Sequence, residues 1–542
     1  MTPEDIEALE HHYLGPTWKR DPDTGGWLLP EKTLGWQVAA WCAEYMLAED
    51  GGPWRFTLEQ LRFVLWWYAV DETGRFTYRK GVLQRMKGWG KDPLLAVLCL
   101  VELVGPSRFD HWDEQGNPVG VRHPQAWVQV TAVNQAQTTN TMALIPGLIS
   151  PKMKAVYDIK DGAELIRAMG GTVRLVAVTS SYRALEGGRT TFTLLNETHH
   201  WVSGNNGHKM YETIDGNATK KDSRYLAITN AFLPGEDSVA ERMREAWEKI
   251  REGRAADVGF LYDSVEAHEL TPLTPEALRI VLPKIRGDAV WLNVEAIIQS
   301  VLDTTIPASR SRRMWLNQVV AEEDAMYGPS DWKALEDEAA VLRPGDKITL
   351  GFDGGKTDDA TALVALRVSD QCGFVLLVEE RPDGPAGDGW QVDREKVDSA
   401  VHEAFRLFEV QGFYADVALW ESYIDEWAEL YGERLVTKAG QQHAVAWDMR
   451  GSLQRSTRAH ERLMTAIFDG KIKHDGDPAL RRHVMNVRRR ENNYGVSFGK
   501  ESRESPRKVD LYAALMLAYE AFHDLRTKAK RRKERTGNGF FF

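Results

Sequence analysis

The sequence has 542 residues and a formal net charge of -11 at pH 7. Its length suffices for about two to four domains, and 43% hydrophobic with 27% charged residues is typical of a folded chain rather than a disordered one. We find no apolar run of the roughly 18 residues that a membrane span requires and no signal-peptide layout, so we expect a cytoplasmic protein. The acidic balance excludes a protein that coats nucleic acid with its whole surface, which leaves local basic patches as DNA contacts.

A basic loop with two glycines joins an extended run, residues 78–84, to an apolar helix. Backbone N–H groups at a helix start attract anions, and Lys91 is placed to reach the terminal phosphates of a nucleotide. The loop departs from the usual pattern at Arg85, where the first glycine would stand, and at Asp92, where a Ser or Thr would contact magnesium. Taken alone, it also suits a surface turn. The candidate ATP contacts are Arg85, Lys87, Gly88, Gly90, Lys91 and Asp92.

Strands alternate with helices through residues 126–230, which predicts a parallel sheet. One apolar strand, residues 189–195, is followed by Asn196 and Glu197. An acidic residue at such a strand end is typical of the water-activating side of an ATPase, so Glu197 is the candidate that orients or deprotonates the attacking water. Asn196 replaces the usual aspartate and removes a charge from the magnesium shell, and Asp92 is a hypothetical substitute.

Further polar residues extend this candidate site. Gln60 lies early in a helix and suits an adenine edge, although a solvated helical glutamine is the open alternative. Thr229 and Asn230 end another strand, in place to sense a γ-phosphate. The adjacent His199 and His200 suggest a metal site, but neighbouring side chains point in different directions and no other ligand type clusters near them in the sequence.

The pattern of strands restarts after an acidic, proline-containing segment near residues 328–346. Residues 347–380 predict three antiparallel strands, followed by a helix, the strand 412–416 and a late helix from about residue 506. Strands in a meander, a helix, a parallel strand and a closing helix are the order of a ribonuclease-H-like fold. Basic clusters at residues 481–490 and 500–503 suit contacts with a DNA backbone, or a solvated helix face.

Three aspartates occupy the places that converge in such a fold. Asp353 ends the first strand, Asp416 ends the fourth, and Asp510 lies in the first turn of the last helix. Converging carboxylates repel one another unless divalent cations neutralise them, which favours a two-metal phosphodiesterase site with Mg²⁺ or Mn²⁺. Each aspartate taken alone would suit a helix cap or a surface acid.

An ATPase core followed by a ribonuclease-H-like nuclease resembles the large subunit of bacteriophage terminases. The resemblance covers nearly the whole chain and rests on segments 84–93, 194–201, 312–318, 351–361 and 508–514. It implies an α/β chain with an N-terminal P-loop ATPase domain of the additional-strand, RecA-like class and a ribonuclease-H-like nuclease domain. The expected parts are an ATPase domain at 1–335 with a helical preface over about 1–50, a linker at 336–345, a nuclease domain at 346–525 and a basic flexible tail at 526–542.

The same resemblance implies roles for the candidate residues. Terminases often carry a displaced basic residue early in the phosphate loop, where Arg85 and Lys87 stand. Glu197 would be the catalytic glutamate and Gln60 the adenine contact, and Thr229 with Asn230 would couple hydrolysis to movement. Asp353, Asp416 and Asp510 would be the catalytic and metal-binding acids of the nuclease.

The implied function is a motor that uses ATP to move double-stranded viral DNA into a procapsid, with a Mg²⁺- or Mn²⁺-dependent endonuclease that cuts concatemeric DNA. The implied partners are a portal protein, a small terminase subunit and further copies of the chain in a pentameric ring. It would work in the host cytoplasm, transiently at the portal, and be absent from the mature virion. The alternatives are an ATP-dependent helicase-nuclease of DNA repair and a nucleotide-binding assembly scaffold without catalysis.

Overall fold

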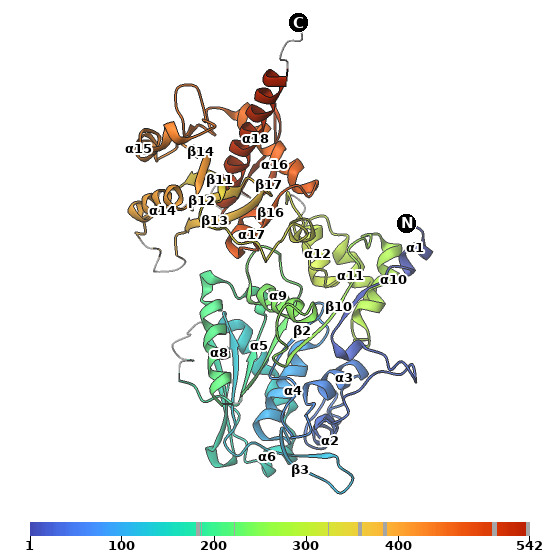
Figure 1. The fold of residues 1–542 in the computed structure, drawn as a ribbon. Coiled ribbons are helices and arrows are strands. Elements are labelled where there is room, and N and C mark those ends of the chain that lie inside the picture. The colour runs from blue at the N-terminus through green and yellow to red at the C-terminus, as the bar shows by residue number, and fades with distance from the viewer. Residues whose placement is uncertain are drawn as a thin grey trace. The chain divides into compact units, whose positions relative to one another are not determined.

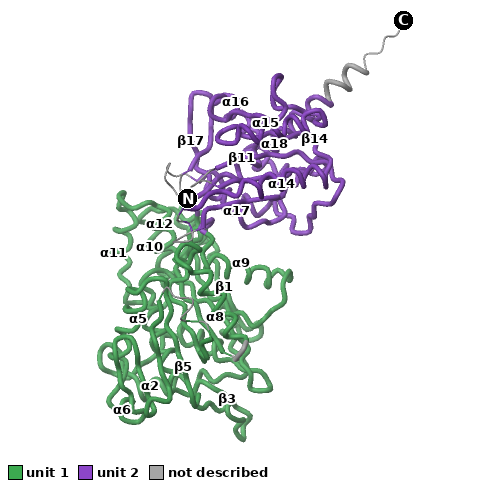
Figure 2. The backbone as a smooth tube through the Cα atoms, turned by 90° about the vertical axis from the view of Figure 1, so that its left-hand side faces the viewer, with its two compact units in different colours: residues 1–233, 237–320 green, residues 234–236, 321–542 purple. Residues whose placement is uncertain are grey.

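The chain divides into two compact units in the computed structural model (Figure 2). Unit 1 comprises residues 1–233 and 237–320, and unit 2 comprises residues 234–236 and 321–542. The structure describes residues 1–179, 185, 187–221, 223–322, 325–355, 360–382, 387, 389–500 and 507–537. Within these residues, no helix combines the length and the apolarity needed to cross a membrane.

Unit 1 is built on an eight-stranded sheet with the order β1-β10-β2-β9-β8-β5-β7-β6. Figure 1 labels two of these strands, the neighbours β2 and β10. The six inner strands are parallel, and the edge strands β1 and β6 are antiparallel to their neighbours. β9 lies between β2, which leads into the phosphate loop, and β8, which leads to Glu197, so the additional-strand arrangement is confirmed. The strands are β1 (His12–Leu14), β2 (Lys80–Gln84), β5 (Trp127–Ala132), β6 (Leu165–Ala168), β7 (Val173–Thr179), β8 (Phe192–Leu195), β9 (Arg224–Thr229) and β10 (Phe260–Glu266).

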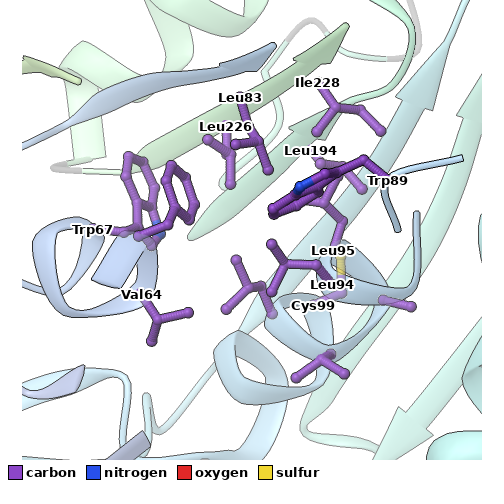
Figure 3. Close-up of a cluster of buried hydrophobic side chains, with 14 of the residues drawn as sticks. Val64, Trp67, Leu83, Trp89, Leu94, Leu95, Cys99, Leu194, Leu226 and Ile228 are labelled. Carbon is purple, nitrogen blue, oxygen red and sulfur yellow. The ribbon is translucent and has the colours of Figure 1, made fainter. Parts of the chain in front are cut away.

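Helices pack on this sheet through apolar faces. Figure 3 shows Trp67 of α3 and Leu94, Leu95 and Cys99 of α4 against side chains of β2, β8 and β9. The expected helical preface is only partly helical, because β1 joins the sheet ahead of α2. The main helices are α1 (Pro3–Glu7), α2 (Gly35–Tyr45), α3 (Leu58–Trp67), α4 (Lys91–Val104), α5 (Gln135–Leu148), α6 (Pro151–Val156), α8 (Gly207–Lys221), α9 (Val239–Arg251), α10 (Pro275–Arg286), α11 (Val294–Val301) and α12 (Ala308–Trp315); β3 (Arg108–Trp112) and β4 (Pro118–Val121) form a separate hairpin.

Unit 2 contains a six-stranded sheet with the order β15-β14-β11-β12-β13-β16. The first three strands form an antiparallel meander, and β14 runs parallel to β11. This is the predicted ribonuclease-H-like topology, and it is confirmed. The strands are β11 (Lys347–Gly354), β12 (Thr361–Arg367), β13 (Cys372–Glu379), β14 (Glu409–Asp416), β15 (Ala446–Trp447), β16 (Lys473–His474) and the hairpin β17 (Arg488–Asn492) with β18 (Gly495–Gly499); the helices are α13 (Pro329–Lys333), α14 (Arg394–Leu407), α15 (Glu421–Tyr431), α16 (Leu453–Phe468), α17 (Pro478–Met485) and α18 (Asp510–Gly537).

The last helix, α18, lies directly on β11. A Cβ added to Gly351 would come within 1.9 Å of the Ala514 carbonyl oxygen and 2.4 Å of the Ala518 nitrogen. Only glycine therefore allows this approach of helix and strand. On the opposite face of the sheet, Ile348, Leu350 and Phe352 of β11 pack with α14 and α15. The alternation places Thr349, Gly351 and Asp353 on the α18 side.

The end of the expected ATPase domain and the expected flexible tail both differ from the structure. Residues 321–335 belong to unit 2, because Tyr327 and Trp332 are buried in its core and the Tyr327 hydroxyl hydrogen-bonds that of Tyr512. Within the expected linker, the Asp337 backbone N–H donates to the His474 carbonyl. The expected flexible tail is helical as far as Gly537, since its Lys, Arg, Ala and Glu residues favour a helix. Residues 538–542, including the three terminal phenylalanines, lie outside the described residues.

Candidate functional sites: a phosphate loop and an acidic centre

The phosphate loop connects β2 to α4 through two glycines with positive φ. Gly88 has φ 78° and Gly90 has φ 92°, a region that side chains disfavour. Gly90 is the residue before the first turn of α4, and no side chain caps that end of the helix. The backbone N–H groups of the first turn are therefore available to an anion, as in a phosphate site. Lys87 and Gly88 are exposed at the loop.

Lys91 is buried beside this loop. Its ammonium group donates to the carbonyl oxygens of Arg85 and Met86, both at 3.1 Å, and to Asn230 Oδ1 at 2.7 Å. Burial lowers the pKa of Lys91 to about 8, and the charges of Glu197 and Asp92 act in the opposite direction. The predicted neighbours Lys91 and Asn230 are thus brought together, and Lys91 lies against the loop that would hold phosphates.

Arg85 does not face the loop opening, unlike its predicted role as an ATP contact. Its guanidinium forms an ion pair with Asp263 and donates to the Gln84 carbonyl, and both side chains are almost completely buried. Trp18 Nε1 also donates to Asp263, at 3.2 Å. A buried carboxylate requires a cation nearby, so Asp263 on β10 holds Arg85 inside the unit. In the sequence, Asp263 stands within the apolar run of β10, and a buried acid at such a position indicates a basic partner.

Gln60 is only 4% exposed, so it is not a solvated glutamine. Its Oε1 accepts the Thr57 backbone N–H at 3.1 Å, and Thr57 Oγ1 accepts the Gln60 N–H at 3.3 Å. This reciprocal pair is a capping box at the start of α3, and the spacing Thr-x-x-Gln is its sequence signature. Gln60 Nε2 lies 3.7 Å from the position that a Cβ on Gly90 would take, so its amide reaches the phosphate loop.

Glu197 lies two residues after the end of β8 and adopts a left-handed backbone conformation, with φ 55° and ψ 53°. This conformation is uncommon for a residue with a side chain and costs on the order of 1 kcal/mol. Burial raises the pKa of the Glu197 carboxyl, the Lys91 charge lowers it and the Asp92 charge raises it. Glu197, Lys91 and Asp92 are therefore close enough to influence one another's charge.

Asn196 and Asp92, the two departures from the usual pattern, lie together. The Asn196 amide donates to Thr141 Oγ1 at 2.9 Å and to the Gln137 carbonyl at 3.2 Å. Burial raises the pKa of Asp92, while the Lys91 charge and the nearby Asn196 amide lower it. Carboxylates of Asp92 and Glu197 beside an uncapped helix start are oxygen ligands of the kind that Mg²⁺ prefers, so these residues fit a magnesium nucleotide.

His199 links Glu197 to the end of β9, a contact that the sequence did not reveal. His199 Nδ1 accepts the Asn230 backbone N–H at 3.4 Å and lies 3.1 Å from Thr229 Oγ1, and Nε2 lies 3.3 Å from Glu197 Oε2. Burial keeps the pKa of His199 well below its ordinary value, so the ring is neutral. With Nδ1 accepting, the proton sits on Nε2, the ring nitrogen that lies 3.3 Å from the Glu197 carboxylate.

This tautomer bears on the alternative of a metal at the two histidines. Ligand atoms of Glu197, His199 and His200 do lie within 4.8 Å of one another. A histidine binds a metal through an unprotonated ring nitrogen, and its other nitrogen usually donates a hydrogen bond. The Nδ1 of His199 instead faces a donor, so its Nε2 carries the proton. The arrangement therefore places a protonated ring nitrogen, rather than a free metal ligand, beside Glu197.

In unit 2, strand register and helix packing bring the three predicted aspartates together. β11 and β14 pair in parallel with Phe352 opposite Ala415, so the next residues, Asp353 and Asp416, are neighbours. Thr349 donates to the Ala518 carbonyl, and Gly351 lies against Ala514. Two residues further along β11 and four residues back along α18, the same alignment sets Asp353 beside Asp510. All three side chains share the α18 side of the sheet.

Burial raises the pKa of Asp416, and the charge of Asp448 acts in the same direction. Asp416 Oδ1 accepts the Met449 backbone N–H at 2.9 Å, which fixes the carboxylate at the sheet edge. Asp510 is 6% exposed, and Asp353 is partly exposed. Asp353, Asp416 and Asp510 thus lie at neighbouring positions on β11, β14 and α18, and carboxylates are the ligands that Mg²⁺ prefers. Asp448, which follows β15, is a further acid at this centre that the sequence analysis did not single out.

The start of α18 is held by Glu380 together with Arg482 and His483, two members of the basic cluster 481–490 that the sequence suggested as DNA contacts or a solvated helix face. His483 Nδ1 accepts the Leu511 backbone N–H at 2.9 Å, and its Nε2 hydrogen-bonds to Glu380. Arg482 donates to the other Glu380 oxygen at 2.6 Å. Despite burial, the hydrogen bond and charge of His483, together with Arg482, lower the pKa of Glu380 to about 2. These contacts position Asp510, the residue before Leu511.

Comparison with known proteins gives close relatives among phage proteins. The chain is 41% identical to the Gene 13 protein of Mycobacterium phage L5 and 40% identical to that of Mycobacterium phage D29, with 97% of each chain covered. It is similar in structure to the large terminase of bacteriophage HK97, with 16% identity and a TM-score of 0.48, over 90% of this chain and 100% of that chain. No protein-family model matches. At this identity and coverage, the chain belongs to the family of the Gene 13 proteins of mycobacteriophages L5 and D29.

Proposed function

We propose that this chain is the large subunit of a phage terminase, a motor that hydrolyses ATP to move double-stranded DNA into a procapsid and a nuclease that cuts that DNA. The observation that carries the proposal is the pairing of two separate sites in one chain. Unit 1 holds Lys91 at a phosphate loop near Glu197, and unit 2 aligns Asp353 with Asp416 and Asp510.

In unit 1, the triphosphate would bind the loop backbone and the N-terminus of α4. Lys91 would exchange its contacts with the loop carbonyls for contacts with phosphate oxygens, where its charge stabilises the transferring phosphoryl group. Glu197 would orient and deprotonate the attacking water, and the Nε2–H of His199 would hold that carboxylate in place. Bound magnesium, with Asp92 among its ligands, would neutralise phosphate charge.

The contact between Lys91 and Asn230 offers a route from hydrolysis to movement. Asn230 contacts Lys91 through its side chain and His199 through its backbone N–H. It is therefore linked both to the phosphate-binding lysine and to the residue beside Glu197. Loss of the γ-phosphate would change the partners of Lys91 and therefore those of Asn230. We assign Thr229 and Asn230 as the element that senses the nucleotide.

In unit 2, Asp353, Asp416 and Asp510 would hold Mg²⁺ or Mn²⁺, which would activate water and stabilise the leaving oxygen during cleavage of a phosphodiester. The proposed partners are double-stranded DNA, a portal protein, a small terminase subunit and further copies of the chain in a ring of five. The proposed place of action is the host cytoplasm, transiently at the procapsid portal, and the protein would be absent from the mature virion.

Phosphate release with and without double-stranded DNA tests the motor. We expect ATP hydrolysis that DNA stimulates, and loss of hydrolysis in Lys91→Ala. A scaffold without catalysis would bind ATP but release no phosphate from the unsubstituted protein. A repair helicase-nuclease would separate the strands of a labelled duplex, which a translocase of intact duplex DNA does not. Either of those results would contradict the proposal.

A further inference from the structure

A half-exposed tryptophan lies on the phosphate loop. Trp291 follows α10, and its side chain is 52% exposed. Its Nε1 donates to the Gly88 carbonyl at 2.9 Å, and its Cζ2 lies 3.0 Å from the position that a Cβ on Gly90 would take. One edge of the indole is therefore anchored on the loop, and much of its surface remains open to solvent.

The segment that carries Trp291 is held in place from several sides. Asp288 Oδ2 accepts the backbone N–H of Glu59, the neighbour of Gln60, at 2.8 Å. Arg286 donates to the Leu292 carbonyl at 2.8 Å, and the Leu292 side chain lies against Gly88. These contacts fix the position of Trp291. The exposed indole is therefore held at the phosphate loop by an ordered segment.

Gln60 faces the same glycine. Its Nε2 lies 3.7 Å from the Cβ position of Gly90, to which Trp291 also packs. Its Oε1 is engaged by Thr57 in the capping box, and among the described residues no acceptor bonds its Nε2. An aromatic surface and a hydrogen-bond donor therefore meet beside the loop that would hold the phosphates. An adenine base has an aromatic face and ring nitrogens that accept hydrogen bonds.

We propose that Trp291 stacks on the adenine base of ATP and that Gln60 Nε2 donates to one of its ring nitrogens. The inference rests on the proposed nucleotide function of unit 1 and on Gln60 as the adenine contact that the resemblance implies, and it adds Trp291 as the residue that stacks on the base. Stacking on an aromatic ring does not distinguish between bases, because every base has a π-face. Trp291 would thus supply affinity for any nucleotide. Gln60 would supply preference for adenine by donating to N1, which accepts a hydrogen bond in adenine but carries a hydrogen in guanine.

The test compares binding of ATP, GTP and inorganic tripolyphosphate, each by competition with a fluorescent ATP analogue. We expect Trp291→Ala to weaken ATP and GTP on the order of tenfold while tripolyphosphate binding stays unchanged, and Trp291→Phe to recover most of the loss. In ATP hydrolysis, we expect Trp291→Ala to raise KM for ATP and to change kcat little. Trp36→Ala is the matched control, because Trp36 is 54% exposed on α2 and should bind ATP like the unsubstituted protein.

Gln60→Glu tests the donor without removing the helix cap, since a glutamate at this position also completes a capping box. We expect it to narrow the preference for ATP over GTP. The inference is overturned if Trp291→Ala binds ATP normally, or if ATP and tripolyphosphate weaken equally, which would mean that Trp291 only shapes the loop. If the unsubstituted protein does not bind ATP, the proposed function fails together with the inference. If it binds ATP and Trp291→Ala binds ATP equally well, only the inference fails.

Discussion

The nucleotide site of unit 1 and the acidic centre of unit 2 are positioned in different ways. In unit 1 the groups lie on turns, where Gly88, Gly90 and Glu197 have positive φ and specific hydrogen bonds hold each side chain. In unit 2 the acids lie on regular elements, and strand register with close helix packing sets their spacing. Single side chains should therefore tune the first site, whereas backbone packing should decide whether the second exists.

The largest expected effect concerns the start of unit 2. A fragment 342–542 lacks Tyr327 and Trp332, each 1% exposed in the core of the unit. Removing a single buried Trp typically costs about 3 to 5 kcal/mol, so this fragment should not fold stably. A fragment 321–542 should give a cooperative thermal transition and nick plasmid DNA with Mn²⁺. Equal stability of the two fragments would show that residues 321–341 are dispensable.

Gly351→Ala tests packing within unit 2. The added Cβ would lie 1.9 Å from the Ala514 carbonyl, so α18 must shift, and with it Asp510. We expect a loss of about 3 kcal/mol or more and little remaining nuclease activity. Gly373→Ala is the control in the same sheet, since its Cβ would meet the end of the Leu515 side chain at 3.1 Å and the Lys473 carbonyl oxygen at an ordinary 3.7 Å. Similar melting and cleavage in both variants would contradict the packing argument.

His199→Ala tests positioning in unit 1. Removing the ring takes away the group that lies beside the Glu197 carboxylate, and misplacement of a catalytic group by about 1 Å can cost on the order of 100-fold in rate. We expect kcat to fall by about that factor with little change in KM, and the melting temperature to fall as well because the buried Asn230 N–H loses its acceptor. His199→Gln, which offers an N–H donor, should recover part of the rate. His200→Ala should behave like the unsubstituted protein, because His200 is exposed; an equal loss there would speak against the assignment.

A smaller effect should follow from the lowered pKa of Lys91, about 8 in the absence of nucleotide. Burial favours the neutral amine, whereas a bound triphosphate favours the ammonium form and raises the pKa. ATP affinity should therefore fall as pH rises through 8, by up to about tenfold per pH unit, with uptake of one proton on binding. Calorimetry in buffers of different ionisation enthalpy at pH 7 and pH 9 measures this uptake. Lys91→Arg, which stays charged, should abolish it.

The comparison also explains what the sequence could predict. The order of strands and helices gave both sheets, and the acids at the ends of β11 and β14 are local features of single strands. The burial of Arg85 against Asp263 could not be predicted, because the two residues are far apart in the sequence. The capping box of Gln60 had a readable local signature, Thr57-x-x-Gln60, that competed with a functional interpretation.

Other features depend on contacts that no local pattern encodes. The contact from His199 to Asn230 joins residues that are 31 positions apart in the sequence. It forms only because the additional strand β9 lies beside β8. Trp291 reaches the phosphate loop from a segment roughly 200 residues later, through one hydrogen bond. The membership of residues 321–335 in unit 2 follows from burial of Tyr327 and Trp332, which composition alone did not reveal.

The central claim is that one chain carries two independent hydrolytic sites, and a crossed experiment tests it most directly. Glu197→Gln and Asp510→Asn, each in the full chain, are assayed for ATP hydrolysis and for plasmid cleavage with Mg²⁺ or Mn²⁺. We predict that Glu197→Gln binds ATP, loses at least about 100-fold in turnover and still cuts DNA, whereas Asp510→Asn hydrolyses ATP and does not cut. Cleavage at the normal rate by Asp510→Asn, or normal hydrolysis by Glu197→Gln, would contradict the claim.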